Sequence, residues 1–273
     1  MGVWANMAFG AAWMAARCAG GYRAVRTAGQ RVWQAGLDLI FPPRCAHCGV
    51  PLEESLAVLL CETCRPKLGP ASWHGCARCG GAVMAGFSSS AGCALCRHVR
   101  FYFDTVLTLG GYHGELKQAI LRTKHAYAEP LAVALAGLFV ELRGEGILAH
   151  RPELVIPIPM HWRRRLVRGI NSADVLAREV GRRLGLPVRC HVLRRRRNDI
   201  PQRYLRPAER YRNVRGAFAV RRATGFQGRR VLLVDDVLTT GATASEAARM
   251  LKRAGAGPVV VAVLARAEGD DRP

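Results

Sequence analysis

Residues 231–243 hold the chemical groups that best indicate a function, and they read Val-Leu-Leu-Val-Asp-Asp-Val-Leu-Thr-Thr-Gly-Ala-Thr. The apolar run Val231–Val234 is typical of a short buried strand, and a helical pattern follows over Ala244–Arg253. Two adjacent carboxylates, Asp235 and Asp236, would then lie at the carboxyl end of that strand. This edge is where open α/β sheets bind their ligands.

The turn between this strand and the helix suits a phosphate. Small and hydroxyl residues at a helix N-terminus leave backbone N–H groups available, and the helix dipole favours negative charge there. We expect this side of the site to consist of Val237, Leu238, Thr239, Thr240, Gly241, Ala242 and Thr243. Residues 239–243, called here the phosphate loop, would surround the phosphate, and the two carboxylates would accept hydrogen bonds from vicinal hydroxyls. Together these groups indicate a ribose phosphate. A plain turn with a capping threonine is the alternative, but uncompensated adjacent acids would be costly there.

The cysteines predict two metal sites. Eight of the ten cysteines form four Cys-x-x-Cys pairs, which are Cys45/Cys48, Cys61/Cys64, Cys76/Cys79 and Cys93/Cys96. Two such pairs complete a closed tetrahedral site for a structural zinc ion. Pairing in sequence order is the simplest arrangement, and a cross-braced arrangement stays open. Disulfides are the main alternative and an iron–sulfur centre a lesser one. Without a convincing secretory signal, disulfides are disfavoured because cytosolic thiols stay reduced.

Positive charge is concentrated in one part of the chain. The formal net charge is +21, and residues 151–230 contain 22 arginines, five acidic residues and no lysine. Arginine binds phosphate bidentately and stacks on bases, so these side chains could hold the pyrophosphate of a small substrate or form a track for single-stranded nucleic acid. A solvated surface of biased composition is the third interpretation. The excess favours a polyanion, and the expected contacts are Arg194, Arg195, Arg196, Arg197, Arg203, Arg210 and Arg212.

The predicted elements alternate between strands and helices, which indicates an α/β fold with a mainly parallel sheet. Strands are expected at Thr105–Leu109, Val155–Met160, 187–193, Val231–Val234 and Val259–Leu264. Helices are expected at Gly114–Arg122, Pro130–Leu142, Ser172–Leu184 and Ala244–Arg253. Between them, residues 194–216 read as a long irregular loop of the kind that often serves as a lid.

The chain divides into three parts by composition. Residues 1–40 form an N-terminal helical extension, 41–100 a double zinc-binding module with few apolar residues, and 101–273 the α/β domain. The small module would fold largely through its metals. The first residues are apolar but too short and broken to predict a transmembrane segment.

The motifs resemble a known family over nearly the whole chain. The Asp-Asp pair with its Thr-Thr-Gly-Ala-Thr loop is similar to the phosphoribosyl-pyrophosphate (PRPP) loop of type I phosphoribosyltransferases. With the four cysteine pairs, the arrangement resembles the ComF family, a double zinc ribbon followed by a phosphoribosyltransferase-like domain. The further matching runs are Phe41-Pro42-Pro43-Arg44-Cys45, Tyr112-x-Gly114, Pro157-x-Pro159-Met160-His161, Arg168-Gly169-x-Asn171 and Arg212-Asn213-Val214-Arg215-Gly216.

This resemblance implies roles for particular residues. Asp235 and Asp236 would hold the ribose hydroxyls, and the phosphate loop would hold the 5′-phosphate. Residues 161–171 would bind pyrophosphate through Arg168 and Gly169, with Arg164 and Arg165 also catalytic as leaving-group cations. Magnesium would bridge the diphosphate and the ribose hydroxyls, residues 194–216 would close over the site, and a nitrogen nucleophile would displace pyrophosphate.

The ComF family is associated with DNA uptake in natural competence. The resemblance therefore implies PRPP or another ribose phosphate as ligand, single-stranded DNA as a partner, and a competence helicase or other protein docked on the zinc ribbons. It further implies a cytoplasmic location, with contact to a membrane only through partners. Two alternatives stay open, namely an active phosphoribosyltransferase on an unknown nitrogenous acceptor without a DNA role, and a PRPP sensor without turnover.

Overall fold

The computed structural model describes residues 42–52, 57–87, 89, 91–161, 170–197, 207–221 and 225–268. The helix expected in residues 1–40 lies outside these ranges. None of the described helices is both long enough and apolar enough to cross a membrane.

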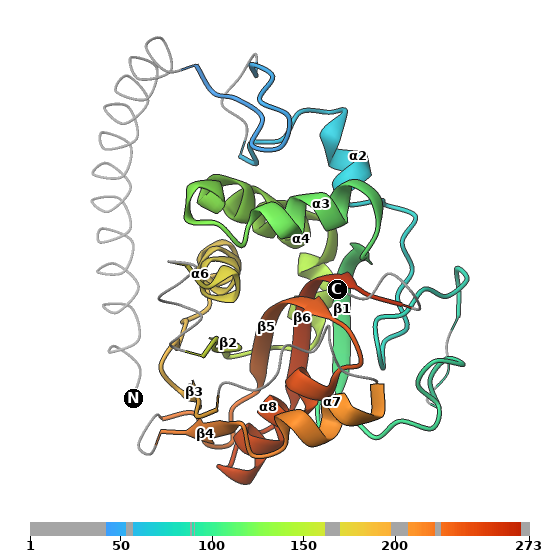
Figure 1. Ribbon diagram of the computed structural model, residues 1–273, viewed down its shortest axis with the longest axis vertical. Helices are drawn as coiled ribbons and strands as arrows, with labels where there is room; N and C mark the ends of the chain where they lie inside the picture. Colours follow the sequence, from blue (N-terminus) through green and yellow to red (C-terminus); the bar gives the residue numbers. More distant parts are fainter. Residues whose placement is uncertain are drawn as a thin grey trace, which may run out of the picture.

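A four-stranded parallel sheet forms the centre of the molecule, with the strand order β1-β6-β5-β2 (Figure 1). The strands are β1 (Thr105–Gly111), β2 (Leu154–Pro157), β5 (Val231–Leu238) and β6 (Val259–Arg266). The two middle strands are nearly continuous apolar runs because helices cover both faces of the sheet. The expected α/β fold with a mainly parallel sheet is confirmed.

Strand β5 runs farther than its apolar residues predict. Its ladder with β6 continues through the pairs Val237 with Ala265 and Leu238 with Arg266. Asp235 and Asp236 therefore lie inside the strand rather than just after it. Backbone pairing with β6, which continues to Arg266, overrides the local change from apolar to acidic side chains, and it holds the two carboxylates on a rigid element.

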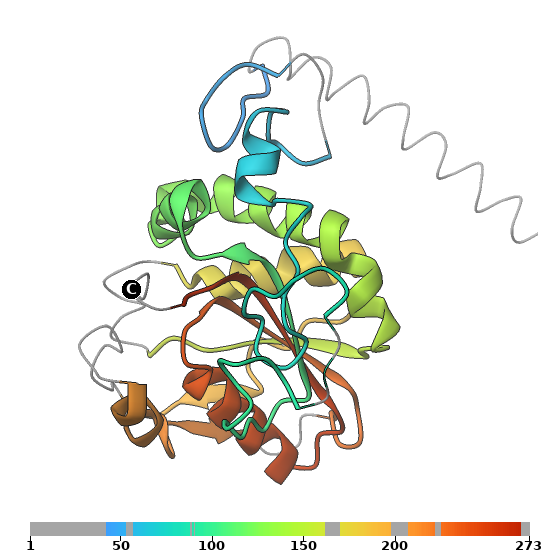
Figure 2. The ribbon, with the colours of Figure 1, turned by 90° about the vertical axis from the view of Figure 1, so that its right-hand side faces the viewer.

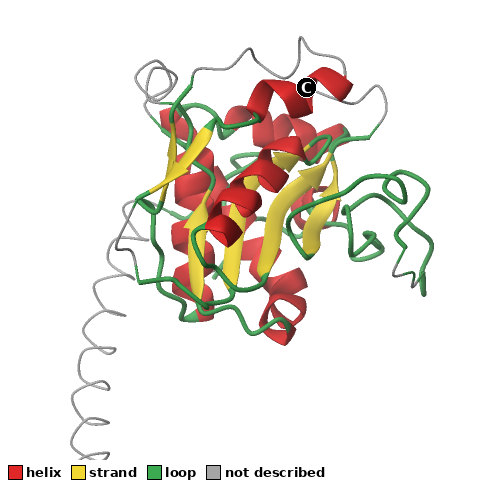
Figure 3. Ribbon diagram, turned by 90° about the horizontal axis from the view of Figure 1, so that it is seen from below, coloured by secondary structure: helices red, strands yellow, loops and turns green. Residues whose placement is uncertain are grey.

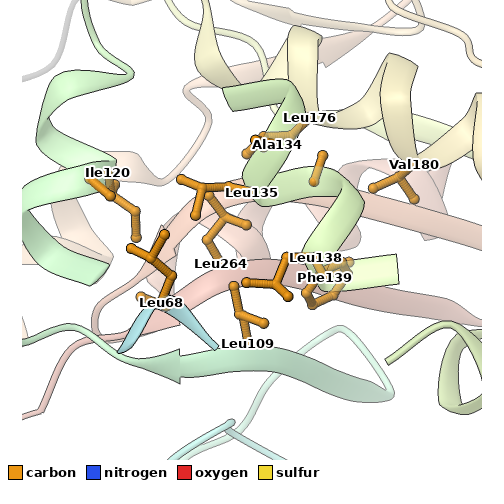
Figure 4. Close-up of a cluster of buried hydrophobic side chains, with 14 of the residues drawn as sticks. Leu68, Leu109, Ile120, Ala134, Leu135, Leu138, Phe139, Leu176, Val180 and Leu264 are labelled. Atoms are coloured by element: carbon orange, nitrogen blue, oxygen red, sulfur yellow. The ribbon is translucent and has the colours of Figure 1, made fainter. Parts of the chain in front are cut away.

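Helices and a small antiparallel sheet cover the two faces (Figure 3). Side chains of β5 alternate, so that Leu232 and Val234 pack on one face and Val231 and Leu233 on the other. The first face carries α3 (Gly114–Arg122), the 3-10 turn Ala126–Ala128, α4 (Glu129–Ala149) and α6 (Ser172–Leu184). Figure 4 shows Leu138 of α4 near Leu109, Leu135 of α4 beside Leu264, and Leu176 of α6 next to Ala134 of α4.

Helix α4 is seven residues longer at its carboxyl end than predicted, because Gly144 and Gly146 do not break it. A methyl group on Gly146 would lie 2.9 Å from a side-chain carbon of Leu107. The glycine thus lets the helix approach β1 closely, and Ile147 beyond it is fully buried. Burial of Ile147 offsets the low helix propensity of glycine in this turn.

The other face carries α8 (Ala242–Arg253), α7 (Pro207–Val214) and the pair β3 (Leu193–Arg195) and β4 (Phe218–Val220). The expectation of an irregular segment over 194–216 is therefore wrong for the residues described. Leu193 and Phe218 are buried against the sheet face that also holds α8. This shared apolar contact stabilises a short antiparallel pair that charge-rich sequence alone does not predict.

The two cysteine-rich segments pack on different parts of this α/β domain (Figure 2). The first includes α2 (Cys64–Leu68) and buries Leu60 and Leu68 against α3 and α4. The second lies beside the edge strand β1, where the N–H of Val106 donates to the carbonyl of Ala77 at 2.8 Å. It thereby covers part of a sheet edge that would otherwise expose unpaired backbone groups.

Candidate functional site

The cysteine sulfurs form two separate clusters that fit zinc. The first zinc cluster consists of Cys45, Cys48, Cys61 and Cys64, and the second zinc cluster of Cys76, Cys79, Cys93 and Cys96. Within each cluster the four sulfurs lie within 4.8 Å of one another. Four sulfurs bound at about 2.3 Å around one zinc ion would be about 3.8 Å apart. The nearest pairs, at 3.5 to 3.9 Å, match this separation and are too distant for disulfides. Pairing is sequential, not cross-braced.

Local backbone geometry explains why each Cys-x-x-Cys-Gly run can hold a metal. Gly49 and Gly80 have φ angles of +80° and +72°, and their N–H groups return to the carbonyls of Cys45 and Cys76. Burial raises the pKa of Cys45, but N–H groups of nearby residues, Cys48 foremost, outweigh it and lower the pKa to about 6. The thiolate of Cys45 is therefore favoured at neutral pH, whereas burial raises the pKa of Cys64 in the same cluster.

Asp235 and Asp236, called here the acidic pair, lie next to the phosphate loop at the carboxyl end of β5. The N–H of Asp236 donates to Oδ1 of Asp235 at 3.0 Å, and the N–H of Val237 donates to Oδ1 of Asp236 at 2.8 Å. Gly241, with φ +81°, turns the chain directly into α8, which begins at Ala242, two residues earlier than predicted. Ala242 and Thr243 thus belong to the first helical turn, whose N–H groups point toward the loop.

The electrostatic environment of the pair is strongly perturbed. Burial and the neighbouring charge of Asp236 raise the pKa of Asp235 well above its usual range, although the positive charges of Arg195 and Lys124 partly oppose this. Burial and the same Asp236 charge raise the pKa of Tyr112 to about 12. Two adjacent acids held in such surroundings are typical of a binding site, because their charges become stable when a cation or hydrogen-bond donors arrive.

Three neighbours of the site were not among the predicted site residues. Lys124, which follows α3, interacts electrostatically with Asp235. Tyr112, which follows β1, interacts electrostatically with Asp236. The hydroxyl of Tyr211 on α7 donates to the carbonyl of Thr240 at 2.8 Å, which fixes α7 to the phosphate loop. The family-like run around Tyr112 was the one sequence signal for the first two, whereas nothing local to Tyr211 indicates its contact.

The structure separates the arginines that were expected to bind nucleic acid. Arg194, Arg195 and Arg196 line a groove of about 600 Å³ with Arg221, next to Pro159 and Met160, which follow β2. On the rest of this surface, Arg197 donates to the carbonyls of Asn213 and Arg215, and Arg212 is exposed on α7.

Arg210 is only 4 % exposed, so it is not part of the exposed arginine surface. Its position on α7 turns the side chain toward the interior, where a polyanion cannot reach it. Arg164, Arg165, Arg168, Gly169 and Arg203 lie outside the described residues. The first four belong to the connection from β2 to α6, both ends of which are described at His161 and Ile170.

Comparison with known proteins assigns the family. A family model described as a double zinc ribbon domain matches residues 36–100, and one described as a phosphoribosyl transferase domain matches residues 166–273. Competence protein F of Haemophilus influenzae is 30% identical over 228 residues, which cover 82% of this chain and 97% of that protein. This chain belongs to the ComF family. DNA utilization protein YhgH of Escherichia coli K12 is also 30% identical, over 76% of this chain and 96% of that protein.

Solved structures show weaker global similarity to this ComF-family chain. An allosteric regulatory enzyme of purine biosynthesis is 25% identical, with a TM-score of 0.33, over 49% of this chain and 26% of that one. Adenine phosphoribosyltransferase from Leishmania donovani is 16% identical, with a TM-score of 0.29, over 46% of this chain and 51% of that one.

Proposed function

We propose that this ComF-family chain binds PRPP or ribose 5-phosphate, together with magnesium, at the carboxyl end of β5. The observation that carries the proposal is the acidic pair inside β5, followed at once by the left-handed turn at Gly241 into α8. This geometry places two carboxylates beside a helix N-terminus, so that one ligand with a diol and a phosphate satisfies both.

The proposed roles follow from these positions. Asp235 and Asp236 would accept hydrogen bonds from the ribose hydroxyls and contribute negative charge toward magnesium. When bound, magnesium would neutralise part of the negative charge of the diphosphate. Arg164, Arg165 and Arg168 belong to the connection between β2 and α6, and β2 is the strand that pairs with β5. Cations in this connection would stabilise a departing pyrophosphate by charge rather than by covalent chemistry.

We further propose that the protein acts in DNA uptake and holds single-stranded DNA. Relatives with the names competence protein F and DNA utilization protein support the first part. Support for the second part comes from the groove lined by Arg194, Arg195, Arg196 and Arg221, where no acidic residue is among the lining residues described. A groove of one charge sign attracts a polyanion and keeps its phosphates near the arginines.

Calorimetric titration of the full-length, zinc-loaded protein with PRPP and magnesium tests the ligand. Wild-type protein is expected to bind, and Asp236→Asn is expected to weaken binding at least about 100-fold, because the variant loses a charge that faces both the diol and the metal. The matched control is Glu145→Gln, which removes a negative charge from an exposed residue of α4 that has no part in the proposed site. Equal affinity in wild type and Asp236→Asn would contradict the proposed site.

A further inference from the structure

Phe101 joins the second zinc cluster to the phosphate loop. Its ring packs against the cluster formed by Cys76, Cys79, Cys93 and Cys96, and it stacks on Phe103 with ring centroids 4.7 Å apart. On its other side, a methyl group added to Gly241 would lie 2.7 Å from Cε1 of Phe101. The ring is therefore in direct contact with the backbone of the residue that turns β5 into α8.

The residues around Phe101 extend this contact along α8. The N–H of Tyr102 donates to Oγ of Ser245, in the first turns of the helix, at 3.1 Å. Near the other end of the helix, Asp104 forms an ion pair with Lys252 at 2.8 Å. Residues 101–104 thus run beside α8 from its first turns to its last.

The same segment is anchored firmly to the second zinc cluster. Arg78 lies between the ligands Cys76 and Cys79 in sequence, and its guanidinium donates to the carbonyl oxygens of Ala91 and Val99, each at 2.6 Å. The N–H of Val99 in turn donates to the carbonyl of the ligand Cys96 at 2.9 Å. A metal ion that fixes the four sulfurs also fixes the backbone from which Phe101 projects.

Gly241 is a position where such packing has consequences. It is the N-terminal cap of α8, its φ angle is +81°, and it makes no side-chain cap hydrogen bond because it has no side chain. A glycine in this region gains conformational freedom when nothing covers it. The direction of the helix's first N–H groups therefore depends on what packs against the turn.

We propose that the second zinc cluster, acting through Phe101 as a positioning residue, holds the phosphate loop in the geometry that binds a ribose phosphate. Zinc bound at the second zinc cluster would then raise the affinity of the phosphate loop for a ribose phosphate, although the cluster itself does not touch that ligand. The inference rests on the proposed function for its ligand. The first zinc cluster provides an internal contrast, because the polar contacts of its described segment go to α3, α4 and α6, as in His47 with Glu115 and Arg183 with Ala57.

The experiment compares variants of the full-length protein by zinc content, by titration with ribose 5-phosphate, and by hydrogen exchange of residues 239–245 without ligand. Phe101→Ala is expected to keep both zinc ions, to weaken ribose 5-phosphate binding about ten- to hundredfold, and to speed exchange in the first turn of α8. Cys93→Ser is expected to have the same effects with loss of one zinc ion. Cys48→Ser, in the first zinc cluster, is expected to lose one zinc ion and leave exchange at these residues unchanged.

Unchanged affinity and unchanged exchange in Phe101→Ala would overturn the proposal, as would equal effects of Cys48→Ser and Cys93→Ser on residues 239–245. If wild-type protein binds no ribose phosphate, the proposed function fails, and the exchange comparison alone then decides whether the cluster holds the loop. If Cys93→Ser does not fold, the Phe101→Ala variant decides, together with Phe101→Leu, which refills much of the apolar volume and is expected to restore most of the affinity.

Discussion

Asp235 is the residue whose surroundings work most clearly against its own charge. It lies within a strand between the buried Val234 and a second carboxylate, and its pKa is raised well above its usual value of 3.8. Functional residues often occupy such unfavourable positions. The folded protein is then less stable than it would be with an uncharged residue at the same place. Here the acid is tolerated because Arg195 and Lys124 supply partial compensation until a ligand binds.

This cost predicts a stabilising substitution. Between pH 3.8 and the raised folded pKa, the folded chain keeps a proton on Asp235 that the unfolded chain has lost. The free energy of unfolding therefore falls as the pH rises through this range. Asp235→Asn has no carboxylate to ionise, so its free energy of unfolding is expected to exceed that of wild type at neutral pH. Each 1 kcal/mol of added stability would raise Tm by about 2–4 °C for a protein of this size.

Thermal unfolding of the ligand-free protein from pH 3 to pH 8 measures the effect. The difference between Asp235→Asn and wild type is expected to be largest near pH 8 and to disappear in acid, where the wild-type carboxyl is protonated in both states. A variant that melts below wild type at pH 8 would show that Asp235 stabilises the ligand-free protein, contrary to this account. Asp104→Asn serves as the control, since it removes an exposed ion pair and brings no gain.

At the scale of elements, α6 is linked to the first zinc-binding segment by Arg183, which a carboxylate of the same helix holds in place. Glu179 accepts hydrogen bonds from Arg182 at 2.8 and 2.6 Å and from Arg183 at 2.6 Å. Arg183 also donates to the carbonyl of Ala57 in that segment. The hydrogen bond from Arg182 is the main reason that the pKa of Glu179 is lowered, although burial opposes it.

Glu179→Gln is therefore expected to lower the free energy of unfolding by about 1–3 kcal/mol at neutral pH, since Arg183, whose side chain is only 17 % exposed, loses its charged acceptor, while the exposed Arg182 adds little. A lowered folded pKa gives stability that is present above the usual value of 4.5 and is lost as the pH falls through the folded pKa. Urea unfolding at pH 7 and pH 3 should show a larger deficit at pH 7 than at pH 3. The control is Glu145→Gln, an exposed glutamate of α4, and an equal deficit in both variants would contradict the assignment.

At the scale of the whole molecule, the arginine groove and the acidic pair are joined by Arg195. This side chain lines the groove, and its charge also acts on Asp235. Its guanidinium lies over the ring of Phe218, 5.4 Å from the centroid, which holds it between the two regions. A strand of DNA in the groove and a ribose phosphate at β5 would accordingly be neighbours, and we expect each to alter the affinity for the other.

The salt dependence of single-stranded DNA binding tests the groove. Replacement of Arg194 and Arg196 by Gln removes two exposed charges and is expected to reduce the slope of log K against log salt by about 1.4, since each phosphate contact on single strands contributes about 0.7. The matched control replaces Arg229 and Arg253, which are equally exposed but lie where β5 begins and α8 ends. Fluorescence anisotropy with a short oligonucleotide gives the slope, and equal slopes in the two double variants would exclude a groove-specific interaction.

The sequence by itself determined the groups that act locally. Cys-x-x-Cys-Gly fixes two thiolates through one tight turn, and Asp-Asp followed by a glycine-containing turn fixes carboxylates beside a helix N-terminus. Such units depend on residues within a few positions of one another, so their types and spacing predict them. The alternation of strands and helices likewise predicts a parallel sheet, because each element's own pattern carries the signal.

Only the tertiary structure decided how distant residues meet. Strand β5 extends to Leu238 because β6 offers it a longer ladder, and Arg210 is turned inward by the packing of α7. The sequential pairing of the cysteines, the closeness of Lys124 to Asp235 and the contact of Phe101 with Gly241 all join residues far apart in the chain. These contacts follow from how whole elements pack, and packing energy is shared among many side chains, so no short motif records it.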